Sequence, residues 1–181
     1  ETNTFFSKVR RVKGTGVSTL DPRTLRPARY HEESLENEVR RVAEVAYGPG
    51  HEVKLASTTD GRTVTLAYRW ANDLSDVVGA IPLLRSLPLA AGSTICFDAY
   101  GVRRMWRVWG TVVAREHVSL PVGEFEAWHL KAEAARLDAT DQRRELHLWL
   151  SDDARRLPLA AVGMIDLGAV RATLKAYSRP F

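Results

Sequence analysis

The sequence has little of what several common function classes depend on. It carries one cysteine in 181 residues, Cys96, so a disulfide within the chain or a cysteine-rich metal site cannot form. No apolar run reaches the roughly 18 residues that a transmembrane helix needs. The Gly-x-Ser-x-Gly, P-loop and Gly-x-Gly-x-x-Gly motifs are missing too. No motif therefore points to a hydrolase or a nucleotide-binding protein, and we expect no cofactor.

The positive charge is modest and dispersed. The formal net charge is +4, and 27% of the residues are charged. A nucleic-acid-binding surface needs its basic residues gathered on one face beside stacking aromatics. Here arginine greatly outnumbers lysine, but the arginines are scattered and acidic residues lie near them in sequence. We therefore expect a solvated surface and no nucleic-acid partner.

The histidines and the cysteine give weak signals. None of the five histidines falls at a metal-ligand spacing on a recognisable helix. His129 and His147 could meet across a hairpin, but two surface or half-buried histidines are expected rather than a zinc pair, so no metal site is predicted. Cys96 lies in the strand-like run "STICFDAY", which favours a buried, inert thiol.

Alternation of apolar and polar residues is the dominant pattern, and it is typical of half-buried strands. Residues 62–70 place Val64, Leu66, Tyr68 and Trp70 on one face. The runs 38–47 and 51–57 alternate in the same way. Asp60-Gly61 is a strong hairpin signal, and "GPG" at 48–50 predicts a turn. Residues 37–70 therefore read as an antiparallel meander.

Residues 73–91 break the alternation. Apolar residues recur there at helical spacing: Leu74, Val77, Val78, Ile81, Leu84 and Leu87. Asp73 or Ser75 could cap the start, and Pro82 and Pro88 limit the length. We expect one or two short helical pieces that end near Ser86. Because the segment is nearly uncharged, it is expected to pack against a sheet.

Strands resume after this segment. The run 103–118 is long and apolar on both faces, and three more alternating runs follow at 144–151, 157–165 and 169–177. Residues 124–137 have helix propensity, but their place between strands favours strand. We predict one β-rich domain over residues 1–181, a curved antiparallel sheet or half-barrel meander with one short helical segment packed on its concave face.

"WLSDDARRLP" at 149–158 is the densest polar stretch. Adjacent residues of a strand point to opposite faces, so Asp152 and Asp153 could share a proton or a metal only within a turn. Aspartate favours turns because its carboxylate bonds the backbone two residues on. A hairpin corner is therefore favoured over a catalytic pair. The predicted turn motif comprises Trp149, Ser151, Asp152, Asp153, Arg155 and Arg156.

Aromatic residues are plentiful on the predicted strands. They can fill a core, or they can line an apolar pocket on the concave face that holds a lipid or an apolar peptide. The candidate pocket comprises Tyr68, Trp70, Leu84, Trp106, Trp109 and Trp128. The pattern leaves both interpretations open, with the core favoured.

Two stretches carry a resemblance to a family. "NDLSDVVGAIPLLRSLPLAAGSTICFDAY" (72–100) and "WLSDDARRLPLAAVGMIDLGAVRATL" (149–174) resemble the exported bacterial family catalogued as domain of unknown function 3108, and "STLDPRTLRPARY" (18–30) is similar to an earlier segment of it. The matching positions are Asp73, Leu84, Arg85, Pro88, Leu89, Gly92, Trp149, Leu150, Ser151, Asp153, Arg156 and Pro158.

The resemblance implies a cell-envelope protein with a curved antiparallel sheet. It also implies a signal peptide and strands upstream of residue 1, where the chain opens on Glu1 without a methionine. The family has no established activity, so the resemblance assigns no catalytic residue.

The expected function is non-enzymatic. The leading hypothesis is a periplasmic or outer-membrane-associated protein that binds an apolar ligand such as lipid or lipoprotein. The alternative is a structural scaffold subunit of an envelope protein complex, reached through sheet edges. A third hypothesis, an envelope hydrolase that uses Asp152 or Asp153, is the least favoured.

Overall fold

The structure is a computed structural model that describes residues 12–139, 141–165 and 168–178. Contacts between Cα atoms divide the chain into two compact units. The described part of unit 1 is residues 12–82 and 98–105, and the remaining described residues form unit 2. The single domain expected over residues 1–181 stays a prediction.

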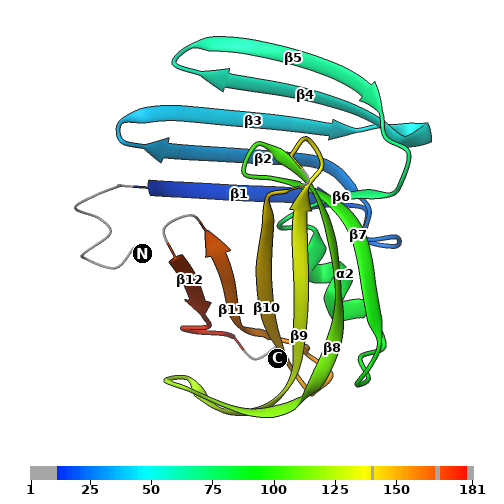
Figure 1. Cartoon of the computed structure of the whole chain (residues 1–181), viewed down its shortest axis with the longest axis vertical. Coiled ribbons are helices and arrows are strands. Elements are labelled where there is room, and N and C mark those ends of the chain that lie inside the picture. The colour runs from blue at the N-terminus through cyan, green and yellow to red at the C-terminus, as the bar shows by residue number, and fades with distance from the viewer. Residues whose placement is uncertain (1–11, 140, 166–167, 179–181) are drawn as a thin grey trace. The chain divides into compact units, whose positions relative to one another are not determined.

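Unit 1 is built on a five-stranded antiparallel sheet. The strands follow the order of the chain, β1-β2-β3-β4-β5, and Figure 1 shows them side by side from blue to cyan. Their bounds are Val12–Leu20, Pro27–Glu36, Val39–Tyr47, Glu52–Thr59 and Arg62–Arg69. This confirms the predicted meander of residues 37–70 and extends it by two strands on the N-terminal side.

The turns of this sheet form where the sequence predicts them. Asp60 and Gly61 both have positive φ, 48° and 76°, which is the backbone that a two-residue type I′ hairpin requires. Between β3 and β4, the short 3-10 helix η1 (Pro49–His51) fills the place of the predicted "GPG" turn. Both turns keep the register of β4 with its neighbours unbroken.

One face of the five-stranded sheet carries the core of unit 1. Alternate residues of the strands are buried there, among them Tyr30, Val45 and Val53. Tyr100 from the end of strand β7 (Thr94–Gly101) joins them, and its ring meets the ring of Tyr30 edge-on at a centroid distance of 6.1 Å. Aromatic residues thus supply much of this core.

The segment that follows β5 differs from the prediction at its start. Residues Leu74–Asp76 form a short strand, β6, which pairs parallel with β7. The expected helical start near Leu74 is wrong, because the buried Asp76 carboxylate accepts hydrogen bonds from the N–H groups of Val78 and Gly79 and turns the chain there. Helix α2 follows at Ala80–Ser86, and its end at Ser86 confirms the predicted limit.

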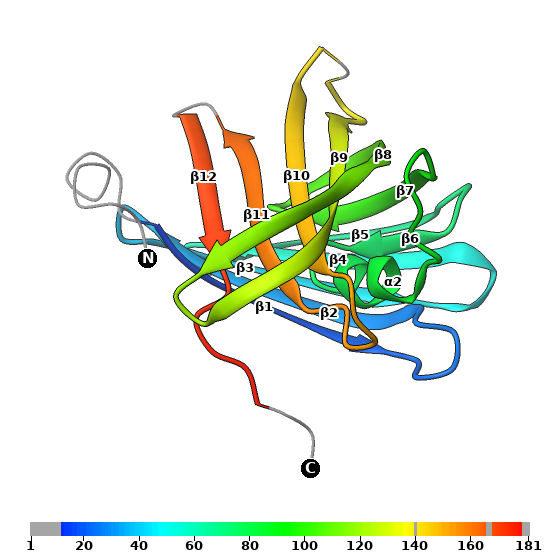
Figure 2. The ribbon, with the colours of Figure 1, turned by 90° about the horizontal axis from the view of Figure 1, so that it is seen from below.

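The second sheet has the order β12-β11-β10-β9-β8-β7-β6. Its remaining strands are β8 (Arg104–Leu120), β9 (Gly123–Arg136), β10 (Arg143–Ser151), β11 (Pro158–Ile165) and β12 (Gly168–Thr173). Residues 124–137 therefore lie in a strand up to Arg136, as their context predicted. A register shift between Val112 and Ala114 bends β8 and β9, and both strands curve along their length (Figures 1 and 2).

Different groups of residues cover the two faces of the sheet in unit 2. On one face, Leu84 of α2 packs with Leu87 and Leu89, which follow the helix, against Val112, Leu130 and Leu150. On the other face, Phe125, Ala127 and Leu159 form a smaller cluster with Leu174 and Tyr177 near the chain end. The predicted fold class is confirmed: the protein is mainly β, with an antiparallel five-stranded sheet, a curled seven-stranded sheet and a short helix.

Cys96 does not lie where the sequence predicted. Its neighbours Ile95 and Phe97 belong to the core cluster of unit 2, whereas Cys96 points to the opposite side of β7 and is exposed. The expected buried thiol is therefore wrong, because an apolar run does not tell which residues of a strand face the core. Within the described residues, no helix is both long and apolar enough to cross a membrane.

Candidate functional site

The corner between β10 and β11 holds most of the residues of the predicted turn motif. β10 ends at Ser151 and β11 begins at Pro158, so residues 152–157 reverse the chain. Arg156 takes a positive φ of 47° within this loop, a conformation that costs a residue with a side chain some free energy. Interactions around the loop must therefore hold it in place.

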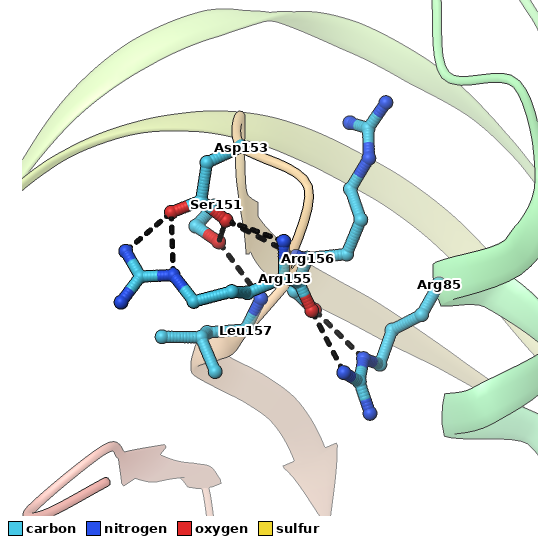
Figure 3. Close-up of polar contacts among 6 residues, drawn as sticks. All are labelled: Arg85, Ser151, Asp153, Arg155, Arg156 and Leu157. Atoms are coloured by element: carbon cyan, nitrogen blue, oxygen red, sulfur yellow. Dashed lines mark hydrogen bonds and ion pairs between the residues drawn. The ribbon is translucent and has the colours of Figure 1, made fainter. Parts of the chain in front are cut away.

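Asp153 is the centre of the loop. One carboxylate oxygen, Oδ1, accepts hydrogen bonds from the backbone N–H of Arg155 at 2.9 Å and of Arg156 at 3.2 Å. It also accepts from the hydroxyl of Ser151 at 2.9 Å. The other oxygen, Oδ2, accepts from Nε and Nη2 of the Arg155 side chain. Figure 3 shows the carboxylate enclosed by these donors.

These donors determine the charge state of Asp153. Burial alone raises the pKa of the Asp153 carboxyl, but hydrogen bonds from Arg155 and Ser151 outweigh burial and hold that pKa below its usual range. The same hydrogen bond raises the pKa of the Arg155 guanidinium. Asp153 is therefore ionised at neutral pH, and its lone pairs are used to hold the loop rather than to exchange a proton.

Ser151 connects the two sides of the corner. It is buried, and its hydroxyl donates to Asp153 while it accepts a hydrogen bond from the backbone N–H of Leu157 at 2.7 Å. Its own N–H donates to the carbonyl oxygen of Leu157 at 2.9 Å. The hydroxyl therefore connects the Asp153 carboxylate to the backbone of Leu157 across the corner.

Arg85 of α2 supports the loop from outside, through a contact that no local sequence pattern indicates. Its Nε donates to the carbonyl oxygen of Arg156 at 3.0 Å and its Nη2 to the carbonyl oxygen of Arg155 at 2.7 Å. In Figure 3 the Arg85 side chain reaches from the helix to these carbonyls, while the Arg156 side chain points away from Asp153. The two stretches that carry the family resemblance thus meet at this contact.

Asp152 belongs to a separate set of contacts. Its carboxylate accepts a hydrogen bond from Nε1 of Trp128 at 2.6 Å and forms an ion pair with Arg115 at 2.6 Å. Its backbone N–H donates to the carbonyl oxygen of Glu126. The Arg156 guanidinium lies 3.6 Å from the Asp152 carboxylate. The two aspartates therefore have different partners, and the geometry does not bring them together as an acid–base pair.

An open depression adjoins the corner. Its volume is ≈ 380 Å³, and the residues that line it include Phe125, Asp153, Arg155 and Tyr177. The Arg155 guanidinium lies over the Tyr177 ring, 5.3 Å from its centroid. Trp149, the remaining member of the predicted motif, lies apart from this depression, and its Nε1 donates to Glu116 at 2.9 Å.

The six residues of the predicted apolar pocket lie in different places. Tyr68 and Trp70 pack on the core of unit 1. Leu84, Trp106 and Trp128 belong to the core cluster of unit 2. Trp109 lies under the guanidinium of Arg143, which is 5.6 Å from its ring centroid.

Metal-ligating residues form no obvious centre in the part of the chain that the structure describes. There, no group of three or more histidine, cysteine, aspartate or glutamate side chains is placed to hold a metal ion. His129 and His147 do meet, with Nε2 of the first 2.7 Å from Nδ1 of the second. The sequence allows such a meeting across a hairpin, with two surface or half-buried histidines expected rather than a zinc pair.

Comparison with known proteins identifies the family. The model of the family described as "Protein of unknown function (DUF3108)" matches residues 1–175. The chain belongs to this family. Among curated proteins and among solved structures, no significant match was found. Membership in DUF3108 confirms the resemblance that the 72–100 and 149–174 stretches carry, and it assigns no activity to the corner.

Proposed function

We propose that this DUF3108 protein is a non-enzymatic protein of the bacterial cell envelope, periplasmic or outer-membrane-associated, that binds an apolar ligand such as a lipid or the acyl chain of a lipoprotein. The observation that carries the proposal is an exposed apolar surface at the β5 end of the five-stranded sheet. The envelope location rests on the implication of the family resemblance.

The surface continues the core face of unit 1. Cross-strand pairing aligns Leu66 with Leu55 and Val45, and it aligns Val64 with Ser57 and Ala43. Val45 and Ala43 are buried, whereas Leu66 and Val64 at the edge are 52% and 61% exposed. Scattered exposed apolar residues are normal, but neighbouring ones on a face that is otherwise core indicate a binding surface.

A depression lies at this end of the sheet. Its volume is ≈ 590 Å³, and it is lined by Ser57, Thr59, Asp60, Arg62 and Val64. This volume falls within the range of about 300–1,000 Å³ that small-molecule sites occupy. Val64 in this depression and the exposed Leu66 beside it can contact an acyl chain, and Arg62 can pair with an acidic group, so the place suits an amphiphile.

The face of β8, β9 and β10 that Leu84 and Leu87 cover is a weaker candidate. The end of α2 already fills that face, so a ligand there would have to displace the helix. The β5 end needs no such rearrangement. For this reason we place the ligand on β5 rather than on the six residues of the pocket predicted from sequence.

Native mass spectrometry with lipid extraction tests the proposal. Protein purified from its own envelope is expected to carry bound lipid. Leu66→Glu places a charge on the proposed surface and is expected to lose that lipid. Val17→Glu is the matched control, because Val17 is 60% exposed on the opposite face of the same sheet. Absence of lipid from the wild type, or equal loss in both variants, overturns the proposal.

A second candidate function is a scaffold subunit of an envelope protein complex. The favouring observation is the edge of β5, eight residues that pair in unbroken register with β4 on one side and with no described strand on the other. Such an edge can pair with a strand of another chain. Cross-linking and pull-down from the envelope separate the two functions, since a scaffold is recovered with a defined protein and a lipid carrier with lipid.

A further inference from the structure

Four titratable side chains form a line on one face of the sheet in unit 2, away from the surface proposed above. Glu116 comes from β8, His129 from β9, and Glu145 and His147 from β10. In the register of the sheet, His129 lies opposite Trp149 and His147 lies opposite Lys131. The two histidines are therefore diagonal neighbours on adjacent strands, within reach of each other.

Hydrogen bonds connect the four side chains without a gap. Nδ1 of His129 is 2.8 Å from a Glu116 carboxylate oxygen, and Nε2 of His129 is 2.7 Å from Nδ1 of His147. Nε2 of His147 is 2.9 Å from a Glu145 carboxylate oxygen. The imidazole rings are inclined by only 26° with centroids 5.0 Å apart, so the nitrogens face each other edge to edge.

Counting protons shows what this arrangement requires. Three hydrogen bonds need three protons, and each bond has one donor. A hydrogen bond from Trp149 lowers the pKa of Glu116, and a hydrogen bond from His147 lowers the pKa of Glu145, so both carboxylates are ionised acceptors. Two neutral imidazoles supply only two protons, so one of the three contacts lacks a proton. When both protons point at the carboxylates, that contact is the one between the rings, where two lone pairs face each other 2.7 Å apart.

We propose that His129 and His147 form a binding site for one proton, held between Nε2 of His129 and Nδ1 of His147. With this proton the pair carries one positive charge. The proton completes the line of hydrogen bonds from β8 to β10, and it fastens the three strands together. A second proton places two N–H groups face to face and separates the rings.

The surrounding charges favour this single proton. Glu116 and Glu145 supply two negative charges, and Lys131 supplies one positive charge at 3.0 Å from Glu145. With one proton on the histidine pair, the charges of the pair, Glu116, Glu145 and Lys131 sum to zero. Glu133 and Arg143 on the same face form their own ion pair, and Arg171 adds one positive charge. Arg171 of β12 lies in the same row as His147, with Val162 between them, and Trp149 stacks on His129 at 4.5 Å.

Burial strengthens the hydrogen bond between the rings. The His129 side chain is 12% exposed and the His147 side chain is 21% exposed. Water therefore competes little for the bridging proton, and an unpaired nitrogen in this place is costly.

The proposal gives the pH dependence of stability a definite shape. Unfolded histidines titrate near about pH 6.5, so below it the unfolded chain holds two protons on this pair and above it none. The folded pair, as proposed, holds one between the facing nitrogens. Stability from the pair therefore falls on both sides of about pH 6.5, and the folding equilibrium constant changes by up to about tenfold per pH unit.

Urea unfolding between pH 4.5 and 9 of the wild type and of the double variant His129→Gln/His147→Gln, in which neither position can bind a proton, tests this shape. The difference between the two unfolding curves is expected to peak near about pH 6.5 and to fall on either side. His117→Gln is the control. His117 is 61% exposed, and hydrogen bonds to Glu126 and Glu124 raise its pKa. Its contribution is present at low pH and lost as pH rises, without a maximum.

Nitrogen-15 NMR of the wild-type imidazoles tests the proposal without a variant. One shared proton predicts that, at neutral pH, the four ring nitrogens of His129 and His147 hold three protons. Nδ1 of His129 and Nε2 of His147 are each protonated, and the two facing nitrogens share one strongly downfield bridging proton. Two neutral rings at pH 7, or a difference between the wild type and the double variant that runs in one direction with pH, overturn the proposal.

Discussion

Removing the Asp153 carboxylate is expected to destabilise unit 2 by a predictable amount. In Asp153→Ala the N–H groups of Arg155 and Arg156 and the hydroxyl of Ser151 lose their acceptor. A hydrogen bond to a charged group contributes about 1.5–3 kcal/mol when it is shielded from water. The side chains of Asp153 and Arg155 are each 36% exposed, so water replaces part of this loss.

We therefore expect a loss of about 2–3 kcal/mol, most of it from the two N–H groups and the hydroxyl, since an exposed ion pair such as that with Arg155 contributes only about 0.2–1 kcal/mol. Asp153→Asn keeps a neutral acceptor for the N–H groups and loses the ion pair. It is expected to cost about 1 kcal/mol. The order Ala, Asn, wild type in rising stability follows from the geometry of the loop.

Urea unfolding followed by tryptophan fluorescence measures these values in the right part of the chain, because Trp106, Trp109, Trp128 and Trp149 all lie in unit 2. Glu133→Gln is the control, since Glu133 forms only a 3.4 Å exposed pair with Arg143, and its effect is expected within about 0.5 kcal/mol. An Asp153→Ala variant as stable as this control would refute the structural role of the corner.

Three further predictions follow from other parts of the molecule. Gly110→Ala is expected to lower the free energy of unfolding in urea by more than about 3 kcal/mol, because a Cβ at Gly110 would lie 2.2 Å from the carbonyl oxygen of Lys131 in the paired strand. A loss below about 1 kcal/mol would contradict the register of β8 with β9. Burial raises the pKa of Asp76, so the folded state binds the Asp76 proton more tightly than the unfolded state does. The stability of the wild type relative to Asp76→Asn is therefore expected to rise as pH falls through the folded pKa. A stability difference that stays flat in unfolding curves from pH 4 to 8 would argue against this burial. Cys96 is exposed, so it is expected to react with a thiol reagent in the native protein at a rate close to that in urea, and strong protection would place it elsewhere.

The strands and turns could be predicted because their signals are local. Alternation over 62–70 fixes which residues share a face, and Asp60-Gly61 accepts the positive φ that the hairpin needs. The β9 segment, in contrast, has helix propensity, and its pairing with β8 and β10 overrides that preference. Context predicted it correctly where propensity alone would not.

Other features depend on contacts between distant residues and leave no local signal. Leu74–Asp76 reads as part of a helix because its apolar spacing fits one, but pairing with β7 makes it a strand. Arg85 reaches the carbonyl groups of residues 155 and 156, about seventy positions away in the sequence. The diagonal meeting of His129 and His147 depends on the β9–β10 register, which sequence alone does not fix.

The candidate site could be predicted in part. The corner at 149–158 was expected as a turn, and the hydrogen bonds from Arg155 and Arg156 to Asp153 follow the local pattern that turn aspartates adopt. The exposed apolar surface of β5 could not be foreseen, because alternation predicts a buried face for Val64 and Leu66. The alternation of residues cannot show that the buried core stops short of the edge strand β5.

Photo-cross-linking in living cells tests the proposed binding function most directly. A photoreactive amino acid at position 64 lies on the proposed surface, and one at position 17 lies on the opposite face of the same sheet. Our account predicts that position 64 captures lipid or the acyl chain of a lipoprotein and that position 17 captures neither. Capture of neither at position 64, capture of a protein without lipid there, or equal lipid capture at both positions would contradict it.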